Sequence, residues 1–227
     1  MDFPPDRSTR DELIAFLSDD VPRHPQSFTL LAVDGVDGSG KSTFARALAD
    51  HLRKTGALVV LIQADNFHHL RATRYRLGRH SPEGFWLDSY DYPALFRDAI
   101  HPFAPGGSGK YRTKASDLER DAYVDEPYRQ ALPGTVAIIE GMFLHRDELC
   151  GYWDYSVFLQ VPFNETAARM SRRDGSPDDP EHPDMRRYVE GQRLYFRSCE
   201  PWLRASRVID NTDWERPQLI GADTVLP

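Results

Sequence analysis

The chain has 227 residues, a length that suits one ordinary domain spanning 1–227. Hydrophobic residues make up 40% and charged residues 28%, as in soluble globular proteins, and no apolar run approaches the roughly 18 residues that a membrane helix needs. The net charge of −7 disfavours a nucleic-acid partner, whose binding draws on Lys and Arg. The acidic N-terminus and the two cysteines lead us to expect a cytoplasmic protein without a membrane partner or a disulfide framework.

Apolar runs and helical patterns alternate along the chain. The first 27 residues predict a helical appendage, with a short helix at 11–17 that Pro22 and Pro25 separate from the first apolar run. Buried strands are predicted at 28–33, 57–62, 135–139, 155–161 and 207–209. Helices are predicted after Lys41 and near 92–100, 164–173 and 185–198. This alternation predicts a doubly wound α/β domain with right-handed crossovers.

Two stretches have the composition of loops. One is 105–109, with three glycines, and the other is 174–184, with three prolines and many charges. Each is a candidate for a mobile flap beside a site.

The first predicted strand runs into a segment that matches G-x-x-x-x-G-K-[ST] at every fixed position, from Gly35 to Ser42. Glycines at these positions let successive backbone N–H groups face phosphate oxygens, and the following helix adds the positive end of its dipole. Lys41 is expected to bridge the β- and γ-phosphates, and the Ser42 hydroxyl is expected to ligate Mg²⁺. The predicted nucleotide-binding residues are Gly35, Asp37, Gly38, Ser39, Gly40, Lys41, Ser42 and Thr43.

Two carboxylates follow predicted strands at the sheet edge where parallel sheets place their chemistry. Asp65 comes after 57–62, and Glu140 comes directly after 135–139, as in a Walker B strand. A kinase needs a base for the acceptor hydroxyl and carboxylates for its metal, and both residues are candidates. A turn aspartate and a simple strand-end acid remain the alternative interpretations.

Other polar and aromatic groups carry weaker signals. His68 and His69 lack the accompanying ligand pattern of a zinc site, so we predict no zinc. Arg169, Arg172 and Arg173 precede the proline-rich stretch, and one or two of them are candidates to cover the transferring phosphoryl group. A solvated helix face is the alternative interpretation. The aromatic cluster at 85–92 fits a core more readily than a base-stacking platform.

Over residues 28–212 the chain resembles the uridine kinase and phosphoribulokinase group of P-loop kinases, and especially the bacterial uridine kinase-like proteins. The similarity rests on Gly35 to Ser42, Asp65 to His68, Tyr90 to Pro93, Tyr111, Ile139 to Gly141 and the arginines at 169–173. It implies a three-layer P-loop NTPase fold with a five-stranded parallel core and a helical lid at about 164–198. ATP and Mg²⁺ are then the expected cofactors.

The resemblance also implies roles for individual residues. Asp65 would be the base, and Ser42, Asp65 and Glu140 would surround Mg²⁺. The implied catalytic residues are Asp65, Lys41, Arg169 and Arg173, and the implied substrate contacts are Asp65, His68, Asp91 and Tyr111. The chain departs from the family at Ser116, where a histidine is usual, and at 175–184, where an arginine-glycine-arginine stretch is usual.

The expected activity is an ATP-dependent phosphotransferase that acts on an alcohol group of a small molecule, a nucleoside such as uridine or cytidine. A phosphorylated sugar or a vitamin precursor is the alternative acceptor. A P-loop regulator without kinase activity is the rival from another class, although the chain lacks the Asn-Lys-x-Asp segment of GTPase switches. Whether the protein forms a homo-oligomer stays open.

Overall fold

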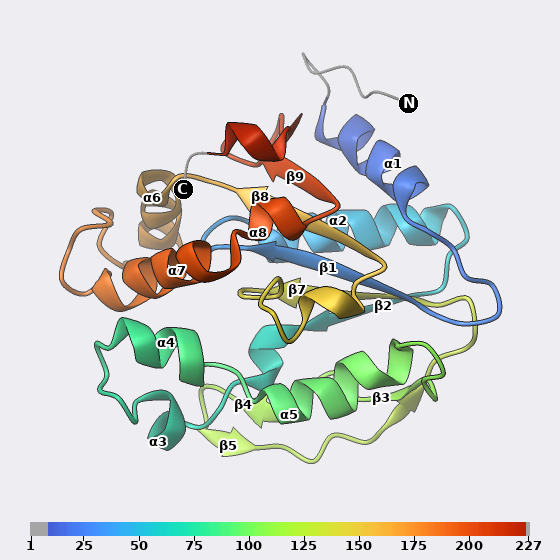
Figure 1. The fold of residues 1–227 in the computed structure, drawn as a ribbon, viewed down its shortest axis with the longest axis horizontal. Helices are drawn as coiled ribbons and strands as arrows, with labels where there is room; N and C mark the ends of the chain where they lie inside the picture. The colour runs from blue at the N-terminus through green and yellow to red at the C-terminus, as the bar shows by residue number, and fades with distance from the viewer. Residues whose placement is uncertain (1–8, 226–227) are drawn as a thin grey trace.

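The computed structural model describes residues 9–225, so the first eight residues of the predicted appendage lie outside the described part. Its centre is a sheet with strand order β10-β9-β8-β1-β7-β2 (Figure 1). The five parallel strands are β1 Thr29–Gly35, β2 Val59–Gln63, β7 Val136–Gly141, β8 Tyr155–Gln160 and β9 Arg207–Asp210. β1 lies between β7 and β8, with Thr29 opposite Val136 and Leu31 opposite Tyr155.

The predicted five-stranded sheet is correct for the parallel core but misses a sixth strand. β10, Gln218–Ile220, pairs antiparallel with β9 at one edge of the sheet. It has three residues and is exposed or half-buried along its length. A strand of this kind has no continuous apolar run, because only one edge and part of one face are covered.

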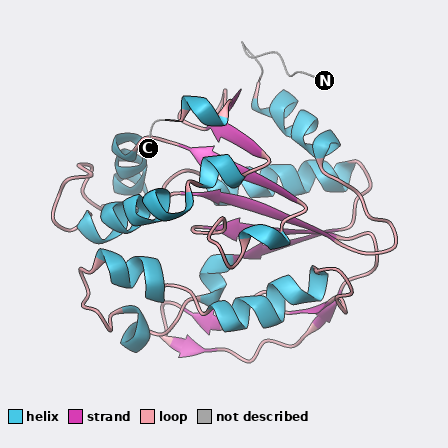
Figure 2. Ribbon diagram, in the orientation of Figure 1, coloured by secondary structure: helices cyan, strands magenta, loops and turns pink. Residues whose placement is uncertain are grey.

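Helices cover both faces of the sheet, which gives the three layers of the predicted α/β fold (Figure 2). The helices are α1 Arg10–Asp20, α2 Lys41–Lys54, α3 Arg71–Arg74, α4 Pro82–Asp88, α5 Tyr92–Leu95, α6 Phe163–Asp174, α7 Arg186–Cys199 and α8 Pro201–Arg204. Two small hairpin-like pairs lie apart from the main sheet: β3 Lys110–Tyr111 with β6 Arg129–Gln130, and β4 Ser116–Asp117 with β5 Ala122–Tyr123. None of the helices among residues 9–225 combines the length and apolar character needed to cross a membrane.

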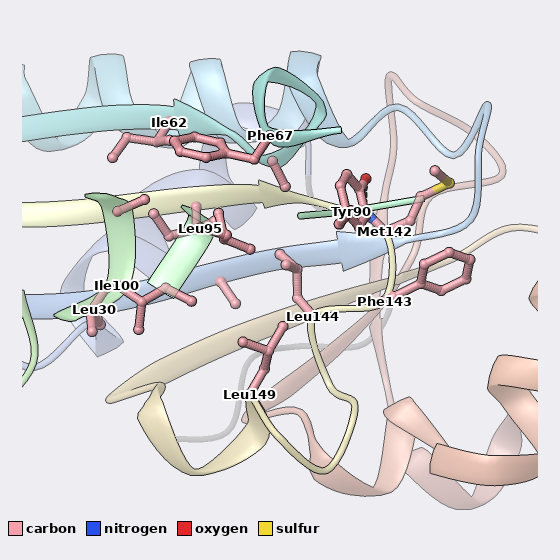
Figure 3. Packing of buried hydrophobic residues seen from close by; sticks show 14 of the residues in the cluster. Leu30, Ile62, Phe67, Tyr90, Leu95, Ile100, Met142, Phe143, Leu144 and Leu149 are labelled. Carbon is pink, nitrogen blue, oxygen red and sulfur yellow. Dashed lines mark hydrogen bonds between the residues drawn. The ribbon is translucent and has the colours of Figure 1, made fainter. Parts of the chain in front are cut away.

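Each face of the sheet has its own hydrophobic cluster. On one face, α1 and α2 bury Leu13, Leu17, Phe44 and Leu48 against β-strand residues such as Val33. On the other face, the larger cluster surrounds Phe67, Tyr90 and Phe143 and includes the segment after β7 (Figure 3). Because strands buried on both faces have apolar residues at successive positions, β1 and β7 are buried at every residue.

A buried carboxylate joins three parts of the chain beneath the first glycine of the motif. Asp34, at the end of β1, is fully buried, and its Oδ1 accepts the N–H of Gly35 at 2.7 Å. Its Oδ2 accepts the backbone N–H of His145 at 3.2 Å, a bond from His145 Nδ1 at 2.7 Å, and the hydroxyl of Tyr195. We call these four residues the Asp34 hub. Burial, followed by the charge of Asp34, raises the pKa of Tyr195 well above its usual value, so this hydroxyl is a donor.

Tyr195→Phe tests the Asp34 hub, because it removes a hydroxyl that donates to Asp34 and accepts from the backbone N–H of His145. A hydrogen bond to a charged group contributes about 1.5–3 kcal/mol, and we expect the free energy of unfolding in urea to fall by that amount. Tyr123→Phe is the matched control, since Tyr123 is 58% exposed, and it should change stability by less than about 0.5 kcal/mol. Equal stability of the two variants would contradict this role of the hub.

Candidate active site

The Gly35 to Ser42 segment forms a tight loop between β1 and α2 (Figure 1). Gly38 and Gly40 have φ values of 75° and 90°, which favour glycine. A Cβ at Gly38 would lie 2.7 Å from the carbonyl oxygen of Thr166, and one at Gly40 would lie 2.9 Å from Nδ2 of Asn211. The loop therefore requires glycine for its backbone conformation and also for the close approach of its neighbours.

Side chains from other elements hold this loop in place. The Asp37 N–H donates to Oε1 of Gln192 on α7 at 2.6 Å, and Asn211 Nδ2 donates to the carbonyl of Ser39 at 2.7 Å. Lys41 Nζ donates to the carbonyl of Val36 at 2.8 Å, which turns the ammonium back over the loop. The first N–H groups of α2 have no carbonyl partner within the helix, so they remain available to an anion.

Glu140 ends β7 beside the start of α2. Its Oε1 accepts from Gln63 Nε2 at 3.0 Å, and its side chain also bonds to Ser42. Burial raises the pKa of Glu140, while the charge of Lys41 and the bond from Ser42 oppose that shift. Asp65 is close enough to raise the same pKa further. Glu140 thus bonds to Ser42, and Lys41 and Asp65 lie near enough to act electrostatically on its carboxylate.

Asp65 follows β2 in the 3-10 turn Ala64–Phe67 and is oriented by two aromatic side chains. Its Oδ1 accepts from the Tyr90 hydroxyl at 2.7 Å, and that hydroxyl in turn accepts from the Met142 N–H at 3.3 Å. His68 Nδ1 lies 2.8 Å from the carbonyl oxygen of Asp65, and its ring packs on Tyr90 with 4.6 Å between centroids. Within the described residues Oδ2 of Asp65 has no hydrogen bond, so it is available to a substrate.

A cavity of about 420 Å³ opens beside these groups. Of the predicted site residues, Asp37, Lys41, Asp65, His68 and Arg173 line it. Arg74, Tyr75, Phe85, Tyr188, Arg187 and three methionines complete much of the wall. Asp174 and Ser176 also line it, which brings the start of the predicted 174–184 loop to the cavity. The other predicted flap, 105–109, does not line the cavity. Its Gly109 N–H donates to the Pro102 carbonyl, and its Gly109 carbonyl accepts from the Ala131 N–H.

The arginines of α6 have different surroundings. Arg173 Nη1 lies 3.5 Å from Oδ1 of Asp37, at the cavity. Arg169 instead donates to the carbonyls of Asn211 and Thr212, at 2.9 and 2.7 Å, behind the glycine loop. Arg172 is largely exposed and bonds to Glu165 at 3.4 Å.

Two predicted substrate contacts lie away from the cavity lining. The Asp91 carboxylate caps α5 by accepting the Ala94 N–H at 3.0 Å. Tyr111 is buried against Phe103, with ring centroids 5.2 Å apart. Ser116 is buried too, with its hydroxyl 3.4 Å from the carbonyl oxygen of Asn66.

A second cavity, of about 510 Å³, lies behind the glycine loop. Gly40 and Thr43 of the loop and first turn of α2 line it, together with Arg169, Asn211 and Trp214. Trp214 is 38% exposed, and the Arg10 guanidinium lies 4.2 Å from its ring centroid. The two cavities flank the glycine loop.

The sequence patterns miss the residues that orient the carboxylates. They predict a core role for Tyr90, although its hydroxyl also donates to Asp65, and they give no role to Gln63, Gln192 or Asn211. Tyr90 lies only 25 positions from Asp65, and both residues belong to segments on which the family resemblance rests. Gln192 and Asn211 are 155 and 172 positions from their partners, and no local pattern links such distant residues.

Comparisons with known proteins agree with this arrangement. No curated protein matches the chain by sequence. A possible uridine kinase from Bacillus stearothermophilus is 23% identical with a TM-score of 0.69, covering 88% of this chain and 96% of its own. A candidate fructose transport system kinase from Silicibacter sp. TM1040 is 24% identical with a TM-score of 0.63, covering 85% and 96%.

Phosphoribulokinase from Rhodobacter spheroides is 17% identical with a TM-score of 0.56, covering 82% of this chain and 70% of its own. At these identities the likeness is one of fold, and it confirms the fold resemblance that the sequence indicated. The AAA domain family matches residues 31–194, which include the glycine loop, both candidate carboxylates and the arginines of α6. The chain therefore belongs to the AAA domain family of P-loop proteins.

Proposed function

We propose that this protein is an ATP-dependent kinase that transfers the γ-phosphoryl group to a hydroxyl of a small molecule. The observation that carries the proposal is that Glu140 bonds to Ser42 of the glycine loop, while Lys41 and Asp65, which both act electrostatically on Glu140, line a cavity of small-metabolite size. A regulator that only binds nucleotide needs the loop and the metal carboxylate. It has no use for an oriented second carboxylate that faces a separate cavity.

The residues around the glycine loop fit a nucleoside triphosphate. A loop closed to side chains at Gly38 and Gly40, followed by the N-terminus of a 14-residue helix, provides converging N–H donors for phosphates. Lys41 would exchange its bond to the Val36 carbonyl for phosphate oxygens. The cavity lined by Arg169 and Trp214 would receive the base.

The donor set at Ser42, Asp65 and Glu140 fits Mg²⁺, because all three supply oxygen. When bound, Mg²⁺ would neutralise charge on the phosphate oxygens. Gln63 fixes one oxygen of Glu140, and Tyr90 fixes one oxygen of Asp65. These two donors would hold the carboxylates in place as ligands or bases, the role of outer-shell partners at metal sites.

Asp65 is the proposed base. The acceptor oxygen forms a bond to the γ-phosphorus, the bond from that phosphorus to the β,γ-bridging oxygen breaks, and ADP leaves. The acceptor proton passes to Oδ2 of Asp65, while Tyr90 holds Oδ1. Arg173 lies on the cavity beside Asp37 and would neutralise charge on the transferred group, whereas Arg169 would brace the loop from behind.

A nucleoside acceptor draws its support from the resemblance more than from the cavity. Of the implied contacts, Asp65 and His68 line the cavity, whereas Asp91 and Tyr111 are engaged elsewhere. We therefore propose a hydroxyl of a small molecule as the general acceptor and keep a uridine- or cytidine-like nucleoside as one candidate within it.

We predict that Lys41→Ala and Ser42→Ala each lower phosphoryl transfer by at least about a hundredfold, because catalysis of this kind is mostly electrostatic. Release of ADP with an excess of acceptor measures it. Lys54→Ala, at the exposed end of the same helix, is the control and should retain full activity. Thermal unfolding is measured beside the rate. Near-normal turnover of either variant would remove the assignment of the glycine loop.

We predict that Asp65→Asn lowers the transfer rate by about 10² to 10⁴, the usual contribution of a positioned base. Binding of ATP should persist, because the loop is unchanged. Tyr90→Phe should give a smaller loss, since the carboxylate remains but its orienting donor is gone. Retention of more than about a third of the activity by Asp65→Asn would make Asp65 an ordinary turn residue.

For nucleosides, we predict weak discrimination between bases. Ser116 stands where the family has a histidine, and its hydroxyl already lies near the Asn66 carbonyl. A single hydrogen bond distinguishes bases by about ten- to a hundredfold. Values of kcat/KM for uridine, cytidine, adenosine and guanosine should therefore lie within about a thousandfold of each other, and a stricter pyrimidine preference would refute the prediction.

A further inference from the structure

Two arginines of the 420 Å³ cavity beside Asp65 form no ion pair with a described carboxylate. Arg74 of α3 and Arg187 of α7 both line the cavity that contains Asp65. Across residues 9–225 neither forms an ion pair, and the hydrogen bonds that they donate go to backbone carbonyls. Carbonyl partners satisfy N–H groups but leave the positive charge without a counter-ion.

Arg187 is the buried member of the pair, with 5% of its surface exposed. It donates to the carbonyls of Gly78, Arg79 and Ser81 through Nη1, at 3.2–3.4 Å, and to that of Arg74 through Nη2 at 3.1 Å. Burial lowers its pKa, and the nearby charge of Arg74 adds to that shift. Arg187 therefore fixes the segment after α3 and brings a second positive charge near Arg74.

Arg74 is half-buried and keeps donors free for a ligand. Its Nε donates to the His69 carbonyl at 2.8 Å, and its guanidinium carbon lies 5.3 Å from the Tyr75 ring centroid. Its Nη groups have no hydrogen bond to the described residues. Tyr75 also lies 5.0 Å from the Arg187 guanidinium, so one aromatic ring orients both arginines.

The acidic residues nearby are already engaged. Asp37 and Asp174 both pair with Arg173, at 3.5 and 2.8 Å, and Asp65 is held by Tyr90. Asp88, which acts electrostatically on Arg187, forms its ion pair with Arg76 at 2.9 Å. Among residues 9–225 no carboxylate forms an ion pair with Arg74 or Arg187, and two guanidinium groups without a paired carboxylate beside a partly desolvated cavity can bind an external anion.

We propose that the phosphoryl acceptor is an alcohol that also carries a carboxylate or phosphate group, which the Nη donors of Arg74 bind with the charge of Arg187 near them. The acceptor hydroxyl lies at Asp65 in the same cavity. Guanidinium presents paired donors that match both anions, which explains the use of arginine at this position. The inference names the substrate class of the proposed kinase and rests on that function.

Binding of four probes to the full chain tests the inference. The protein is first saturated with a non-hydrolysable ATP analogue and Mg²⁺, so that the glycine loop is occupied. Calorimetry then compares ribose, ribonate, ribose 5-phosphate and uridine. We expect at least one charged probe to bind about ten- to a hundredfold more tightly than ribose and uridine, the range for hydrogen bonds to charged groups. The tighter of ribonate and ribose 5-phosphate identifies the anion as carboxylate or phosphate.

Variants of one helix separate the role of Arg74 from a general effect of charge. Arg74→Gln should abolish the preference for the charged probe, Arg74→Lys should retain part of it, and affinity for the ATP analogue should stay unchanged. Arg71→Gln is the matched control, because Arg71 is exposed on the same helix, and it should behave as wild type.

Three results would overturn the inference: wild type that binds neither charged probe, wild type that binds ribose or uridine at least as tightly, or an Arg74→Gln variant that keeps the preference. In each case the proposed kinase function stands if ATP-dependent transfer to some alcohol is measured. If wild type fails to bind the ATP analogue while folded, the kinase function fails, and the inference fails with it.

Discussion

The buried carboxylate of Asp34 is the constraint on which the arrangement of the site depends. A charged group without water costs several kcal/mol unless hydrogen bonds compensate it, and here four donors surround it. Those donors belong to Gly35, to His145 after β7, and to Tyr195 of α7. The end of β1, the segment beyond Glu140 and the helix that carries Arg187 are therefore held at one point.

Hydrogen bonds also orient the two candidate carboxylates of the active site, Asp65 and Glu140. In each of them a neutral donor fixes one oxygen. Tyr90 fixes Asp65 and Gln63 fixes Glu140, at 2.7 and 3.0 Å. A neutral donor orients a carboxylate without removing its charge, whereas an arginine would compete with a metal ion. Burial raises the pKa of Glu140, and a cation at this position would favour its charged form.

Sequence reasoning predicted the features that are encoded locally. The parallel strands are continuous apolar runs because both faces are covered, and the Gly35 to Ser42 segment is found because its glycines, lysine and serine have the fixed spacing of a known motif. The features that sequence reasoning missed depend either on residues far apart in the chain or on very short elements. Tyr195 lies 161 positions from Asp34, and β10 has only three residues at an exposed edge. Arg74 lies in a four-residue helix, which is too short to show a periodic pattern of apolar residues.

The charges of the cavity show why net charge predicts little about a small ligand. The chain carries −7 overall, which opposes the approach of anions at long range. Screening limits that field to about 8–10 Å at ordinary ionic strength, so a ligand inside the cavity responds to its immediate neighbours. There Asp37 and Asp174 form ion pairs with Arg173, whereas neither Arg74 nor Arg187 forms an ion pair with a described carboxylate. The overall acidity thus disfavours the approach of a large polyanion such as a nucleic acid, whereas a small anion in the cavity would interact chiefly with the guanidinium groups of Arg74 and Arg187.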